Sequence, residues 1–140
     1  MIAAIAAAIG AEAFPARAEN ARVPALRAAP LGSGAISDRE AHRDTTGLAH
    51  ALRNGTVVIR AQAARALGRI QNRGSVPALT AALQDRAAAV RHEAAFALAL
   101  VGDSTAAPAI AARLPGEPDP TVRATLVTAL GYIGARRQAP

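Results

Sequence analysis

Three stretches of the chain carry the same spacing of apolar residues, and successive stretches lie 31 or 32 residues apart. In each stretch the apolar residues fall at i, i+4, i+7, i+8 and i+11. The three sets are Ile59, Ala63, Ala66, Leu67 and Ile70; Val90, Ala94, Ala97, Leu98 and Val101; and Val122, Leu126, Ala129, Leu130 and Ile133. With about 100° of rotation per residue, each set lies on one stripe of a helix. The sequence therefore predicts an all-α array of helical repeats.

Turn residues between the stripes give the expected ends of the helices. We expect helices over residues 47–53, 57–70, 76–84, 88–101, 106–114 and 121–133. Asp119 and Pro120 form a helix start, because a carboxylate caps free N–H groups and proline needs no hydrogen-bond partner at the first helical position. Gly134 marks the expected end of the last helix.

The first 46 residues depart from the repeat pattern. Residues 2–11 form an apolar run, and the small-x-small triplet ending at Ala18 has the form that signal peptidases cleave. No basic residue precedes the run, so two interpretations of residues 1–18 stay open: a signal peptide of a periplasmic or secreted protein, or the start of a cytoplasmic chain. Residues 19–46 contain Pro24, Pro30 and a Gly-Ser-Gly tract, which predict a linker or a degenerate cap with a short helix near residues 37–43. Residues 135–140 form a tail.

The amino-acid composition indicates which classes of macromolecule the chain can bind and which covalent sites it lacks. The net charge is +6 and all 16 basic residues are Arg, a balance that attracts nucleic acid or acidic proteins. Acidic residues are interleaved with the Arg residues of the repeats, and few aromatic side chains are present to stack on bases. We therefore do not expect nucleic-acid binding. The chain has no Cys, which excludes a disulfide framework and a thiolate site.

The repeat pattern resembles that of HEAT repeats. Residues 90–102 read Val-Arg-x-x-Ala-x-x-Ala-Leu-x-x-x-Gly, and residues 122–134 repeat most of this pattern. Pro77-Ala78-Leu79 is similar to the Pro-x-Leu of the short subclass named after phycobilisome lyases. The resemblance covers residues 47–134 and implies an α-solenoid, an armadillo-like HEAT superhelix of about three helix pairs. It also implies a non-catalytic protein-interaction scaffold without a cofactor. The alternative is an accessory subunit of a lyase or hydroxylase-like enzyme related to phycobilin lyases or deoxyhypusine hydroxylases.

An Arg follows the first apolar residue of each set, and a polar residue stands six positions before that Arg. The Arg residues are Arg60, Arg91 and Arg123, and the polar residues are Asn54, Asp85 and Glu117. We expect each guanidinium to face the polar side chain of the preceding turn, so that the pairs form a structural ladder that fixes how the repeats stack.

One dipeptide suggests metal chemistry. In deoxyhypusine hydroxylases, which are HEAT arrays, His-Glu pairs on several repeats hold two iron ions, and His92-Glu93 matches one such pair. The equivalent positions of the other repeats are Ala61-Gln62 and Ala124-Thr125. A single pair falls short of the ligand set that a di-iron site needs, so His92 and Glu93 are weak metal candidates and no metal is expected.

Two further features concern protein partners. Phe96, Leu100 and Tyr132 flank the core stripes at equivalent angles, and they form either a partner-binding patch or packing between repeats. Arg113 and Arg53 stand on the intervening short helices as additional binding candidates.

The last stripe helix ends the array. If each unit begins with a stripe helix, the chain holds two full units and two half units. No second helix then covers Leu126, Leu130 and Ile133, and a protein partner or a second copy is expected at this C-terminal edge.

Overall fold

The computed structural model describes residues 32–138, and the predictions for residues 1–18 and for residues 19–31 lie outside this range. The helices of the described range are α3 (Ser33–Ala41), α4 (Thr45–Asn54), α5 (Val57–Ile70), α6 (Val76–Ala82), α7 (Ala88–Val101), α8 (Ala107–Arg113) and α9 (Pro120–Gln138). Short 3₁₀ turns precede α6 and flank α8 on both sides. Residues 32–138 are thus all-α, and α5 and α7 have the bounds that the apolar stripes predict.

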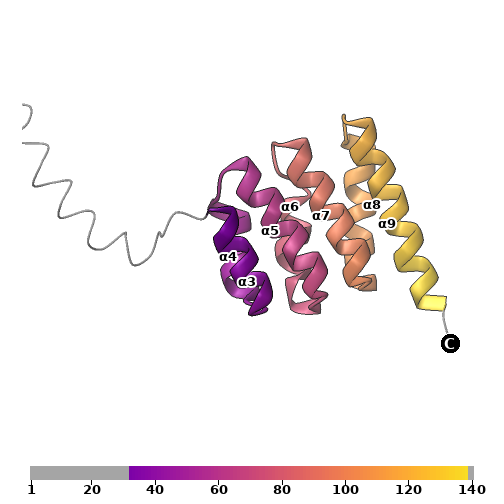
Figure 1. The fold of residues 1–140 in the computed structure, drawn as a ribbon. Coiled ribbons are helices and arrows are strands. Elements are labelled where there is room, and N and C mark those ends of the chain that lie inside the picture. Colours follow the sequence, from indigo (N-terminus) through magenta and orange to yellow (C-terminus); the bar gives the residue numbers. More distant parts are fainter. Residues whose placement is uncertain (1–31, 139–140) are drawn as a thin grey trace, which may run out of the picture. The chain divides into compact units, whose positions relative to one another are not determined.

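The long helices α5, α7 and α9 stack side by side, and the most extensive contact joins α5 to α7 (Figure 1). Each short helix packs mainly on the long helix that follows it: α4 on α5, α6 on α7 and α8 on α9. The repeating unit is therefore a short helix followed by a long one. The array holds three such pairs, with α3 packed on α4 and α5 at one end.

This pairing corrects the expected frame of the repeat. The count of two full units and two half units is wrong, because α8 completes the pair to which α9 belongs. Leu126 and Ile133 are buried against the rest of the array, and Leu130 is half-buried. The expected exposure of this stripe is also wrong, since the stripe faces inward in every long helix.

Small residues in the core let the long helices approach closely. Ala63, Ala94, Ala97 and Ala129 are fully buried, and Leu side chains fill the space between the layers. A Cβ placed on Gly68 of α5 would lie 2.7 Å from the Cα of Ala97 on α7. At that distance only glycine fits without moving the α7 backbone, so Gly68 sets the spacing of the two helices.

Few residues of the described range have a positive φ angle, and each of them lies just after a helix. Gln71 after α5 and Gly102 after α7 both have positive φ angles, of 55° and 67°. Gly134 occupies the same repeat position in α9, yet α9 continues to Gln138. The expected helix end at Gly134 is therefore wrong.

The extension of α9 has a physical cause in Arg136. Its Nη1 donates hydrogen bonds to the carbonyl oxygens of Leu100 and Val101, at 3.3 and 3.5 Å. These oxygens lie in the last turn of α7, where a cation is favoured. The contact ties the end of α9 to α7 and offsets the weak helix propensity of Gly134, which costs about 1 kcal/mol relative to alanine.

The expected short helix near residues 37–43 occurs as α3, which begins four residues and ends two residues earlier than predicted. Ile36 of α3 is buried in the common core, where α3 packs on α5. Arg43, after α3, donates to the carbonyl oxygen of Ile70 at 3.0 Å and so binds the C-terminal end of α5. In the described range, no helix has both the length and the apolar character needed to cross a bilayer.

Candidate protein-binding surface

Two of the three Arg residues of the predicted ladder bind carboxylates of the following turn rather than the preceding one. Arg60 on α5 donates from Nε and Nη2 to the two carboxylate oxygens of Asp85, at 2.8 and 2.9 Å. Arg91 on α7 donates in the same way to Glu117, at 2.8 and 2.7 Å. Each acid lies 25 or 26 residues after its Arg. Two forked ion pairs therefore join successive repeats.

The preceding turn supplies backbone oxygens instead. Arg60 Nη1 donates to the carbonyl oxygen of Gly55, Arg91 Nη1 to that of Asp85, and Arg123 Nη1 to that of Glu117. The expected pairing within each turn is wrong in its partners, and Asn54 takes no part, because its amide donates to the carbonyl of His50.

The position of each acid explains why it reaches across to the neighbouring repeat. Asp85 and Glu117 stand three residues before the first residues of α7 and α9. Each carboxylate also accepts a backbone N–H two residues on, from Ala87 and Asp119 respectively. This turn holds the acid beside the N-terminal end of its own helix, facing the Arg of the preceding long helix.

Glu117 is the most deeply buried charge of the ladder, with a side chain 0% exposed. Hydrogen bonds from Arg91 outweigh the effect of burial and, with the Asp119 N–H and Arg113, lower the pKa of Glu117 to about 2. Hydrogen bonds from Arg60 likewise lower the pKa of Asp85. Both carboxylates are therefore ionised at neutral pH and serve as structural anions.

Arg113 belongs to this ladder and not to a free binding surface. Its Nε and Nη2 donate to Glu117 at 3.1 and 3.0 Å, and its Nη1 donates to the side-chain oxygen of Gln84 at 3.2 Å. Arg113 is therefore a poor binding candidate. Arg53, by contrast, is exposed on α4.

A second line of ion pairs crosses the long helices. Arg65 of α5 forms a two-pronged pair with Glu93 of α7, and Arg69 of α5 reaches Glu40 of α3 at 3.4 Å. These contacts are absent from the sequence predictions. Their only signal is a separation of 28 or 29 residues, close to the repeat period, between residues of opposite charge.

The ion pair of Glu93 with Arg65 affects the two metal candidates, His92 and Glu93. Its carboxylate is buried and bound by Arg65, while His92 Nδ1 lies 3.8 Å from it and is part-exposed. Within residues 32–138, no three His, Asp or Glu side chains gather closely enough to hold a metal ion.

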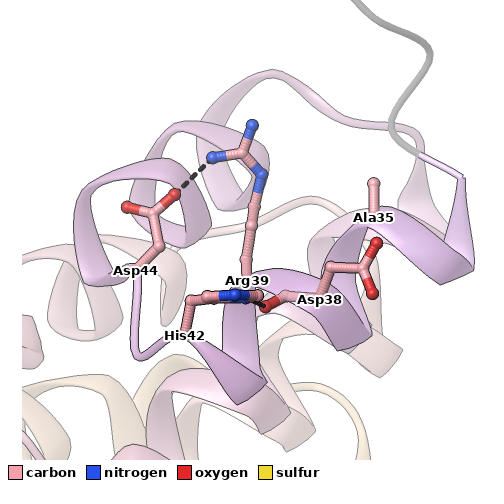
Figure 2. Close-up of a pocket in the computed structure, with 5 residues that line it drawn as sticks. All are labelled: Ala35, Asp38, Arg39, His42 and Asp44. Carbon is pink, nitrogen blue, oxygen red and sulfur yellow. Dashed lines mark hydrogen bonds and ion pairs between the residues drawn. The ribbon is translucent and has the colours of Figure 1, made fainter.

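A surface hollow between α3 and α4 collects polar side chains (Figure 2). Arg39 and Asp44 form an ion pair at 2.5 Å, and His42 Nδ1 donates to the carbonyl oxygen of Asp38 at 2.8 Å. Asp44 also caps α4 by accepting the N–H of Gly47, the contact that contributes most to lowering its pKa. These polar groups are hydrogen-bonded to one another or to nearby backbone groups, and their contacts hold the turn between α3 and α4.

Large apolar side chains are exposed on the long helices. Phe96 of α7 is 46% exposed and Tyr132 of α9 is 60% exposed. Leu100, one turn after Phe96, is half-buried over the contact of α7 with Gly68. Because residues 100 and 132 hold the same repeat position, Leu100 and Tyr132 face the same side of the array.

The comparisons with known proteins agree with this architecture. The family model for HEAT repeats matches residues 45–131, from the first residue of α4 into α9. The matched range holds the pairs α4/α5 and α6/α7, together with α8 and the first part of α9. No curated protein matches the chain significantly. The chain belongs to the HEAT repeat family.

Proposed function

We propose that the chain is a non-catalytic scaffold that binds a protein partner through the exposed aromatic side chains of its long helices α7 and α9. HEAT arrays are in general protein-interaction scaffolds, because stacked repeats present a continuous surface of helices. The observation that carries the proposal is the exposure of Phe96 and Tyr132, two aromatic side chains on neighbouring long helices. Aromatic residues are enriched among those that contribute most to binding at protein interfaces.

The described ionisable groups support a structural role over a catalytic one. Asp85 and Glu117 are held as anions by Arg residues, and Glu93 is bound by Arg65. An iron-ligand role like that in deoxyhypusine hydroxylases would require a free Glu93 carboxylate, and its ion pair with Arg65 argues against that role.

The test begins with an affinity pull-down from the native host and identification of retained proteins by mass spectrometry. The affinity of the purified partner is then measured for the parent chain and for the double variant Phe96→Glu/Tyr132→Glu. We expect binding to weaken by roughly tenfold or more, because charged groups would enter the interface core.

Val58→Glu is the matched control, since Val58 is an exposed apolar residue of α5 outside the Phe96–Tyr132 set. Equal loss of affinity in the control and in the double variant would show a nonspecific effect of added charge. Unchanged binding in the double variant would contradict the proposed surface.

A further inference from the structure

The outer face of α9 is equivalent to faces of α5 and α7 that are each covered by the next long helix. Residues 64, 95 and 127 share one repeat position, and residues 68, 99 and 131 share the next turn. Ala64 and Ala95 are 0% exposed because α7 and α9 pack over them, whereas Val127 is 56% exposed. A Cβ on Gly131 would meet nothing within 4 Å. The face around Val127 and Gly131 thus has the form of an inter-repeat contact. Among residues 32–138 no helix covers it, because α9 is the last long helix of the described stack (Figure 1).

The ladder is also unfinished at this edge. Arg60 and Arg91 each form an ion pair with a carboxylate of the following repeat. Arg123 is exposed and donates only to the carbonyl oxygen of Glu117, and within residues 32–138 no carboxylate pairs with it. The open face therefore presents a guanidinium in the position where two earlier ones hold an acid.

The charge of α9 indicates the chemistry of the occupant. The helix carries Arg123, Arg136 and Arg137 and contains no Asp or Glu. A second copy packed antiparallel on this face would bring Arg123 near Arg137 of the other chain. A parallel packing would bring the two Arg123 side chains together. Both arrangements juxtapose like charges, which disfavours pairing of two α9 helices.

A second copy also lacks a free acid in the required place. Among the described helices, only α7 and α9 are preceded three residues earlier by an acid, and those acids are Asp85 and Glu117. Both are already bound by Arg60 and Arg91. Neither residues 32–138 of this chain nor the same residues of a second copy therefore offer Arg123 a free carboxylate in that position.

We propose that the outer face of α9 docks a helix of a different protein, and that this helix is preceded three residues earlier by an Asp or Glu that pairs with Arg123. The docked helix continues the stack of long helices and packs small or β-branched side chains on Val127 and Gly131. The ion pair repeats the geometry of Arg60 with Asp85 and fixes the register of the partner, as a charge pair across an interface does.

Site-specific cross-linking of the full chain in its native host tests this inference. The photo-reactive residue p-benzoylphenylalanine replaces Val127, and the linked peptides are mapped after irradiation. We expect a link to another protein, on a helix that begins three residues after an Asp or Glu. Arg123→Ala should lower the yield at least about tenfold, while Arg86→Ala, at an exposed Arg in the turn before α7, should leave it unchanged. Arg123→Glu should abolish the link, and exchange of the partner's acid for Arg should restore it.

Several outcomes overturn the inference. These are a link to a second copy of the chain, a link to a helix without the preceding acid, a yield insensitive to Arg123→Ala, and the absence of any link at position 127. The same photo-reactive residue at Phe96 separates this result from the proposed function. A link from position 96 alone refutes the docking on α9 but leaves the scaffold proposal standing, whereas no link from either position counts against both.

Discussion

The outer faces of α7 and α9 are nearly the same surface in two different surroundings. On α7 the face is buried under α9, and Ala95 and Ala99 lie at its centre. On α9 the equivalent residues, Val127 and Gly131, are exposed. The comparison shows that burial of a repeat position depends on the neighbouring repeat as much as on the residue itself.

The solvent exposure of the ladder residues also differs between the interior of the array and its C-terminal edge. The Arg91–Glu117 pair is almost fully buried, with side chains 7% and 0% exposed. The Arg60–Asp85 pair keeps some contact with solvent, and Arg123 at the edge is exposed. One interaction thus occurs in three degrees of burial, and its contribution to stability should differ accordingly.

The largest effect is expected at the buried pair. Glu117→Gln removes the charge that compensates Arg91 and should lower the free energy of unfolding by about 3–5 kcal/mol, because an unpaired guanidinium stays buried. Asp85→Asn, the matched change in the more exposed pair, should cost less, about 1–3 kcal/mol. Urea denaturation of both variants measures the difference. An equal or larger loss for Asp85→Asn would contradict the gradient.

A pH dependence follows from the same carboxylate. The pKa of Glu117 is about 2 in the folded chain and 4.5 in its ordinary state. The unfolded chain therefore binds the proton more readily, so this stabilisation is fully present above pH 4.5 and is lost as the pH falls toward 2. The full loss should amount to roughly 3 kcal/mol, of which roughly 2 kcal/mol falls between pH 7 and pH 3. Urea denaturation between pH 7 and pH 3 measures how the free energy of unfolding depends on pH. If this dependence is unchanged in Glu117→Gln, groups other than Glu117 cause it.

The sequence predicts those elements whose signals are local. The bounds of α5 and α7 follow from the apolar stripe, and in the structure Thr56 is the N-cap of α5 and Gly102 the C-cap of α7. The end of α9 does not follow, since Gly134 matches Gly102 in the repeat and only the contact of Arg136 with α7 carries the helix onward.

The ladder shows a different limit of sequence reasoning. Its Arg residues and two of its acids are evident from their spacing, but an acid six residues before one Arg also lies 25 or 26 residues after another. The periodic spacing fits both pairings, and only the packing of the long helices decides between them. The pair of Arg65 with Glu93 is hidden for the same reason, because it joins two positions of different repeats.

A pair of glycine substitutions tests most directly whether one face is covered and the other open. Gly68 on α5 and Gly131 on α9 hold the same repeat position, and only Gly68 has a neighbour that a Cβ would strike. In the isolated chain, Gly68→Ala should lower the free energy of unfolding by about 1–3 kcal/mol through overpacking against α7. Gly131→Ala should raise it by about 0.5–1 kcal/mol through better helix propensity. Urea denaturation of the two variants beside the parent should show these opposite signs, and a loss of stability in Gly131→Ala would contradict an open outer face on α9.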